Sequence, residues 1–186
     1  MKRLLSILLI AVTLSGCNSG EKSVDKVIAL RSNLQRGESC SFDACVSADY
    51  GETLSYFELA CKLDNQQNWG ITVLQPENIA GITCKITAGN GKLTFDDKVV
   101  AFELITDDQL TPISAPWLAI KALSGGYISS VTDKESGLLV RLDDSYNDIL
   151  YSVDLWVNEN NLPYFAEIIW QGKRIVSMDI NNFQIM

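Results

Sequence analysis

Apolar and polar residues alternate along most of this chain, which is the period of a β-strand with one buried face. The alternation is plainest at Phe42, Ala44, Val46 and Ala48, and again from Ile149 to Val157. Turn-forming Gly, Asn and Asp residues separate these runs. The pattern predicts roughly ten strands, at residues 40–49, 54–63, 69–74, 82–87, 92–95, 99–105, 127–132, 138–143, 149–157, 164–170 and 175–180.

Two segments show helical spacing instead. Over residues 24–36, Val24, Val27, Ile28 and Leu34 fall on one side, and Ser23 is placed to cap the helix start. Over residues 113–123, Trp117, Ile120 and Leu123 share a face, with Thr111-Pro112 before the helix and Gly125-Gly126 after it. Pro76 is expected to open one further helical turn within residues 76–81.

Short turns between successive strands favour antiparallel pairing over crossovers. A twisted sheet of this width must curl or close, and its apolar face needs cover. The two amphipathic helices are the cover that the sequence offers. We therefore predict a mainly β (α+β) fold: a curled antiparallel sheet, or half-open β-barrel, of about ten strands with two helices as a lid.

The N-terminus carries a short apolar run after Lys2-Arg3, and the run ends in Leu14-Ser15-Gly16-Cys17. A membrane-spanning helix needs roughly 17–25 apolar residues, so residues 4–14 are too few to span. Basic start, apolar middle and small residues before a cysteine are typical of a bacterial lipobox. An ordinary secretory signal with a chance cysteine is the alternative.

The lipobox predicts three segments. Residues 1–16 are a signal peptide, residues 17–23 are a tether whose Cys17 carries acyl chains such as palmitate, and residues 24–186 are one domain. Several acyl chains make a stable membrane anchor. The expected location is the cell membrane, on its extracytoplasmic face.

The chain is acidic, with a formal net charge of −8, and removal of Lys2 and Arg3 with the signal leaves it more so. Phosphate contacts need clustered Lys and Arg, so nucleic acid is not an expected partner. Histidine is absent, which excludes Ser-His-Asp and Cys-His catalysis and every His-ligated zinc site. We expect no enzyme activity, no cofactor and no metal.

Four cysteines remain besides Cys17: Cys40, Cys45, Cys61 and Cys84. An even count in an oxidising exterior suggests disulfides, with three pairings to choose from. Buried free thiols are the alternative, because Cys61 and Cys84 alternate with apolar neighbours.

Three motifs favour ordinary structural roles. Ser23-Val24-Asp25-Lys26 has the spacing of a penicillin-recognising acylation motif but lacks its companion elements, so helix capping is preferred. The acidic segment 143–148 lacks the glycine and terminal glutamate of a calcium loop. Glu58, Glu103 and Glu167 lie in predicted strands and receive no role.

Aromatic residues supply the candidate binding wall. The candidates for lining an apolar cavity are Trp69, Trp117, Tyr151, Trp156 and Trp170, together with Phe57 and Phe165. The same residues would serve equally as ordinary core. Trp117 stands out because a lid helix would place it where it could gate the cavity.

A family resemblance is carried by the order of elements and by two segments, Leu74-Gln75-Pro76-Glu77-Asn78-Ile79-Ala80-Gly81-Ile82 and Leu110-Thr111-Pro112-Ile113-Ser114-Ala115-Pro116. In these features the chain resembles the LolA/LolB-like superfamily of bacterial lipoprotein carriers and receptors. Within it the chain is most similar to the GerS-like lipoproteins of Gram-positive bacteria. The resemblance covers nearly all of residues 24–186 and is one of layout, with no individual ligand-binding residue matched.

That resemblance implies a half-open barrel with an apolar concave face. In the carriers this face holds acyl chains. In GerS-like members the fold serves instead as a binding partner of a cell-wall amidase. Two hypotheses follow for this chain. In the first, a non-enzymatic, membrane-anchored protein binds a lipid, acyl chain or other apolar ligand. In the second, it is a docking or activating partner for another envelope protein, such as a cell-wall hydrolase.

Overall fold

Eleven antiparallel strands form one curled sheet in the computed structural model, which describes residues 19–36, 39–51, 53–88, 90–95, 98–102, 105–106 and 109–186. The strands of this sheet are β1 (Cys40–Asp49), β2 (Leu54–Leu63), β3 (Trp69–Gln75), β4 (Thr83–Thr87), β5 (Asn90–Phe95), β6 (Lys98–Phe102), β9 (Tyr127–Lys134), β10 (Gly137–Tyr146), β11 (Ile149–Val157), β12 (Pro163–Trp170) and β13 (Lys173–Ile185). The short strands β7 (Ile105–Thr106) and β8 (Gln109–Leu110) pair separately.

The helices are α2 (Ser19–Gln35) and α3 (Ala115–Gly125), with 3₁₀ turns η1 (Glu77–Ile79) and η2 (Pro112–Ser114). The helical turn expected after Pro76 is thus present as η1. Along the sheet the strand order is β6-β5-β4-β3-β2-β1-β13-β12-β11-β10-β9. Neighbours in sequence are neighbours in space, except where β1 pairs with β13 and joins the two halves.

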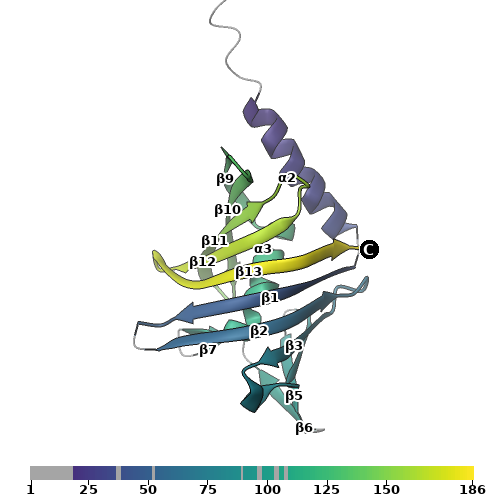
Figure 1. The fold of residues 1–186 in the computed structure, drawn as a ribbon, viewed down its shortest axis with the longest axis vertical. Coiled ribbons are helices and arrows are strands. Elements are labelled where there is room, and N and C mark those ends of the chain that lie inside the picture. The colour runs from purple at the N-terminus through teal and green to yellow at the C-terminus, as the bar shows by residue number, and fades with distance from the viewer. Residues whose placement is uncertain are drawn as a thin grey trace, which may run out of the picture.

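The edge strands β6 and β9 do not pair with each other, so the sheet curls without closing (Figure 1). This confirms the predicted fold class, a mainly β, half-open antiparallel barrel with two helices. Most strands match the expected ranges closely, although β13 runs on to Ile185 and β5 begins at Asn90. The strand expected over residues 99–105 does not: β6 ends at Phe102, and Ile105 belongs to β7, which pairs separately.

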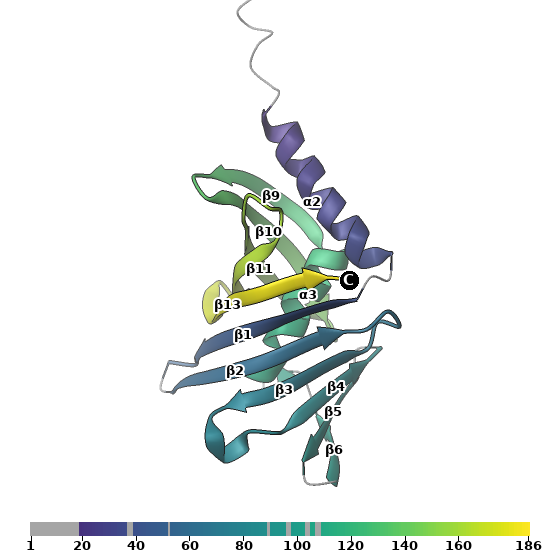
Figure 2. The same ribbon diagram turned by 45° about the vertical axis from the view of Figure 1, so that its right-hand side comes forward.

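The core lies on the concave face, because alternate strand residues point to it. On β1, for example, Cys40, Phe42, Ala44, Val46 and Ala48 are all buried, and the residues between them point outward. Helix α3 lies against this face, behind β1, β2 and β13 in Figure 1 and inside the curve of the sheet in Figure 2. Eight of its residues are buried: Ala115, Pro116, Trp117, Leu118, Ala119, Ile120, Ala122 and Leu123. Of the two helices expected as a lid, α3 therefore packs into the concave side of the sheet.

Helix α2 begins at Ser19, so most of the expected tether is helical. Its buried stripe is Val27, Leu30 and Leu34, while Val24 is 36% and Ile28 is 48% exposed. Ser23 lies inside the helix, and its Oγ donates to Asp133 Oδ1 of β9 at 2.7 Å. The predicted capping role of Ser23 is wrong, because the helix starts a full turn earlier.

Two side chains of α2 bind the C-terminal end of α3. Arg31 donates Nε to the Leu123 carbonyl and Nη2 to the Gly126 carbonyl, each at 2.8 Å. Gln35 donates Nε2 to the Ser124 carbonyl at 2.6 Å. The last carbonyls of a helix have no partner within it, and a cation there opposes the helix dipole favourably. These bonds fix α2 across the end of α3.

Candidate functional site

An apolar pocket lies between α3 and strands β2, β3 and β4. Its walls are mainly the apolar side chains of Leu63, Trp69, Ile86, Trp117 and Ile120, and its volume is about 290 Å³. Both tryptophans are only 6% exposed. The rim is more polar, with Gln67, Lys121 and Ser124. The pocket therefore offers an apolar interior with hydrogen-bonding groups at its edge.

Aromatic contacts hold the two tryptophans in place. Trp69 meets Phe42 edge to face, with ring centroids 6.2 Å apart, and Trp117 meets Tyr146 in the same way at 5.3 Å. Edge-to-face pairs at this separation are favourable beyond the area they bury. The walls of the pocket are thus built from the packed core rather than from loops.

Tyr151 and Trp170 line a second, wider hollow of about 1020 Å³ at the end of the β10–β11 and β12–β13 hairpins. This hollow is more polar. The Tyr151 hydroxyl donates to Asp144 Oδ2 at 3.0 Å, and Lys121 Nζ lies 2.6 Å from the same oxygen. Burial, and then the charge of Asp144, raise the pKa of Tyr151 well above its usual range. The group is therefore neutral at physiological pH and acts as a donor.

Trp156 lies on the opposite, outer face of the sheet. It packs against Phe165 of β12 with ring centroids 5.1 Å apart. The five residues proposed to line one cavity thus lie in three places: Trp69 and Trp117 at the apolar pocket, Tyr151 and Trp170 at the hairpin hollow, and Trp156 outside.

The outer face also holds a groove that the residue pattern did not predict. It has a volume of about 480 Å³ and is lined by Cys45, Val46, Ser47, Tyr56, Phe57, Glu58, Gln75, Pro76 and Asp179. In the strand register, Cys45 of β1 lies directly opposite Glu58 of β2 on one side and Asp179 of β13 on the other. Burial, and then the carboxylates of Glu58, Asp179 and Asp43, raise the pKa of the Cys45 thiol.

The predicted disulfides are absent, because Cys40, Cys45, Cys61 and Cys84 are all free thiols. Cys45 is exposed on the outer face and the other three are buried inside. Cys61 and Cys84 both face Ile71, from β2 and β4 respectively, so one strand separates them. Two strand spacings are about 9.5 Å, which exceeds the Cα separation that a disulfide can bridge.

Three of the acidic side chains considered for chemistry, Asp143, Asp144 and Glu167, have structural partners, and Glu58 lines the outer groove. Asp143 accepts from Ser152 Oγ at 2.6 Å, and Asp144 is held by Lys121 and Tyr151. Glu167 pairs with Arg174 at 2.8 Å. Glu103 lies outside the described residues. Within the described part of the chain, no group of three or more Cys, Asp and Glu side chains is arranged to hold a metal ion.

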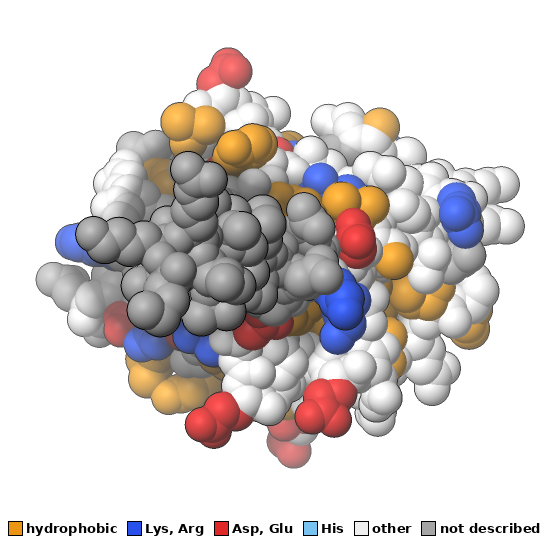
Figure 3. Space-filling model, turned by 90° about the horizontal axis from the view of Figure 1, so that it is seen from above, with side chains coloured by type: hydrophobic (Ala, Val, Ile, Leu, Met, Phe, Trp, Pro, Cys, Tyr) orange, Lys and Arg blue, Asp and Glu red, His pale blue; other side chains and the backbone are white. Residues whose placement is uncertain are grey.

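Neither described helix combines the length and the apolar character needed to cross a bilayer. The end of the molecule at the start of α2 shows Lys and Arg side chains interspersed with Asp, Glu and apolar ones (Figure 3). The visible part of this end therefore forms no continuous basic surface.

Residues 1–18 match the family model of the prokaryotic membrane lipoprotein lipid attachment site. Cys17 lies within this match and outside the described residues. The chain therefore carries a lipoprotein attachment signal. A search of curated protein sequences found no match.

Several solved structures are similar to this chain. One is a LolA superfamily protein from Nitrosomonas europaea, with 11% identity, a TM-score of 0.47, and 88% of this chain and 93% of that one covered. Another is an outer membrane lipoprotein-sorting protein domain from Vibrio parahaemolyticus, with 9% identity, a TM-score of 0.47, and coverage of 89% and 93%. A third comes from the complex of the CwlD amidase with the GerS lipoprotein of Clostridioides difficile, with 14% identity, a TM-score of 0.45, and coverage of 92% and 99%. One of these structures belongs to the superfamily that the sequence resembles.

Proposed function

We propose that this chain is a non-enzymatic bacterial lipoprotein that binds an apolar ligand, such as a lipid acyl chain, in the pocket between Trp69 and Trp117. Its anchor is lipid on Cys17, which holds the domain at the extracytoplasmic face of the membrane. The match of residues 1–18 to the lipid attachment site supports the anchor. The tryptophan-walled pocket supports the ligand class.

The pocket suits an aliphatic chain better than a polar molecule. Leu63, Ile86 and Ile120 join the two tryptophans around a space of about 290 Å³, close to the lower end of the range of about 300–1,000 Å³ for ligand pockets. Each methylene that leaves water contributes about 0.8 kcal/mol. A polar end group would lie at the rim, beside Gln67, Lys121 and Ser124.

A non-enzymatic role agrees with the side chains available. The chain has no histidine, and the carboxylates Asp144, Asp154 and Glu167 are engaged with Lys121, Arg141 and Arg174. Among the described residues that line the pocket there is no carboxylate, and the one cation there, Lys121, is already paired with Asp144. Binding is therefore the activity that these groups support.

The test is titration of the chain from Asn18 onward with a fluorescent long-chain fatty acid. Saturable binding is expected. Ser124→Trp, which places an indole at the pocket rim, should weaken binding at least fivefold. Ser136→Trp, on the exposed β9–β10 turn, is the matched control and should leave affinity unchanged. Absence of saturable binding, or equal loss in both variants, would refute the pocket as the binding site.

The second candidate function is docking to another envelope protein. It is favoured by the outer face of the sheet, where apolar side chains stand exposed beside carboxylates. Tyr56 is 65%, Leu54 53% and Leu74 45% exposed. A partner that covered this face would bury apolar area that now contacts water.

A further inference from the structure

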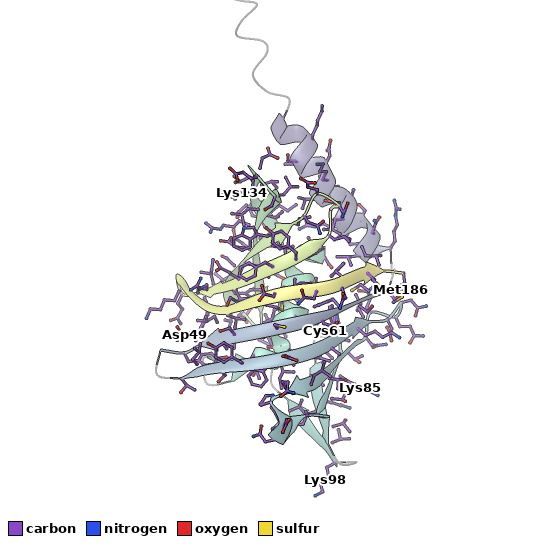
Figure 4. All side chains as sticks on the ribbon, in the orientation of Figure 1. Asp49, Cys61, Lys85, Lys98, Lys134 and Met186 are labelled. Atoms are coloured by element: carbon purple, nitrogen blue, oxygen red, sulfur yellow. The ribbon has the colours of Figure 1, made fainter. Side chains whose placement is uncertain are left out.

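The outer face of β1, β2 and β13 is open to solvent. In Figures 1 and 4 this face is turned toward the viewer, with Asp49 labelled at the end of β1, and no described helix lies in front of it. The strand register places four groove residues in one row across neighbouring strands, in the order Asp179, Cys45, Glu58 and Gln75. The row continues beyond Asp179 to Phe165 and Trp156.

The carboxylates of this row differ from those beside it. In the adjacent row, Asp154 receives two hydrogen bonds from Arg141, and Glu167 receives one from Arg174. Glu58 and Asp179 form no ion pair with any residue that the structure describes. The protein thus neutralises one row with its own arginines and leaves the other negative.

The groove also combines charge with apolar surface. The exposed ring of Tyr56 and the ring of Pro76 border it, and the Trp156–Phe165 pair lies at the other end of the row. Aromatic side chains at a surface are the commonest anchors of protein–protein contacts. They also attract Lys and Arg through the negative face of the ring.

We propose that this outer groove docks a segment of another envelope protein in which Lys or Arg stands beside an apolar side chain. The proposal rests on the second candidate function and names the surface and the chemistry of its partner. The cation would lie between Glu58 and Asp179, and the apolar side chain would pack on Tyr56 and Pro76. A second copy of this chain is disfavoured as the partner, because the chain is net negative and the carboxylates of the groove would repel it. Anionic lipids and nucleic acids are disfavoured for the same reason.

Photo-crosslinking of the full-length protein in its native membrane tests this. Benzoylphenylalanine replaces Ser47, which lines the groove, or Ser129, which is exposed on the edge strand β9. We expect the Ser47 position to crosslink a protein, and mass spectrometry to place the crosslink within three residues of a Lys or Arg in that partner. Glu58→Gln with Asp179→Asn should lower the yield at least fivefold. Glu135→Gln with Glu159→Gln removes two exposed charges elsewhere and should change it less than twofold.

Each other outcome overturns the proposal. Crosslinks at Ser47 to lipid, to a second copy of the chain or to a segment without Lys or Arg identify a different occupant. Equal loss in both double variants means that only net charge matters. A protein crosslinked from Ser129 alone leaves docking intact but removes it from this groove. No protein at either position refutes docking at both surfaces, and the fatty-acid titration remains a separate measurement.

Discussion

Arg31 of α2 donates its Nε hydrogen to the carbonyl of Leu123, the third-last residue of α3, at 2.8 Å. The two residues are 92 positions apart in sequence. This bond couples α2, which follows the lipid attachment site in sequence, to α3, which packs inside the curled sheet. The packing of α2 against the helix that lines the apolar pocket therefore depends on a polar contact.

Replacing Arg31 should loosen that coupling. Arg31→Met keeps much of the aliphatic stem but leaves the carbonyls of Leu123 and Gly126 without their donor. Because hydrogen bonds to charged groups contribute about 1.5–3 kcal/mol, we expect the free energy of unfolding to fall by about 1–3 kcal/mol in urea titrations. Arg36→Met, at an exposed position after α2, should cost less than about 0.5 kcal/mol. Equal effects would show that the contact does not stabilise the fold.

Gly137 should tolerate no side chain. Its φ is +131°, and a Cβ atom there would lie 2.0 Å from the carbonyl oxygen of Val157. We expect Gly137→Ala to cost more than about 2 kcal/mol, seen as a lower midpoint in thermal unfolding. Gly70→Ala is the control, because its Cβ would meet no atom within 4 Å. It should be neutral or stabilise by up to about 1 kcal/mol, since it restricts the unfolded chain. A small effect at Gly137 would contradict the described β10–β11 pairing.

The free thiols predict a labelling pattern. In the native chain from Asn18 onward, an alkylating reagent at pH 8 should modify Cys45 alone, and all four cysteines should react after unfolding. Cys45 should react slowly, because burial and then the neighbouring carboxylates raise its pKa and lower its thiolate fraction. Glu58→Gln with Asp179→Asn should speed the reaction. Mass spectrometry that found any of these cysteines in a disulfide would contradict the pattern.

Alkaline pH should destabilise the protein through its buried thiols. Burial raises the pKa of Cys40 from 9.0 to about 12 and that of Cys84 from 9.0 to about 11. The unfolded chain therefore loses these protons first, so the stability they contribute is complete below about pH 9 and declines as pH rises toward 11–12. Between pH 9 and 10.5 each thiol accounts for a loss of about 1–2 kcal/mol.

The measurement is urea unfolding at pH 8 and pH 10.5 in the presence of a reductant. Cys40→Ala with Cys84→Ala should be less stable at pH 8, because it leaves small cavities. Its stability should nevertheless fall less between the two pH values than that of the parent chain. An equal fall in both proteins would assign the alkaline effect to other groups.

The strands were predictable because each buries one face, so apolar and polar residues alternate along it. That alternation is visible in the local sequence. The start of α2 was not predictable, because the polar residues from Ser19 to Lys22 show no helical spacing of apolar side chains. The helix extends through them from later turns, which its buried residues stabilise. Tyr151 and Trp156 show a limit of grouping residues by type. They are five positions apart in β11, an odd spacing, so period two places them on opposite faces.

The outer groove depends on long-range pairing that local pattern does not encode. Cys45 meets Asp179 because the first strand pairs with the last. Nothing in the residues near Cys45 specifies that partner. The apolar pocket has the same origin, because Trp69 and Trp117 belong to separate elements that only the curl of the sheet brings together.

Because the edge strands β6 and β9 are not hydrogen-bonded to each other, no ring of backbone bonds fixes the circumference of the sheet. The side chains packed inside therefore support its curvature, and α3 contributes eight buried residues to that packing. Larger or smaller side chains on the inward side of that helix would widen or tighten the whole arc. Under the proposed function, substitutions on this one eleven-residue element would change the girth of the ligand that fits, with every strand pairing retained.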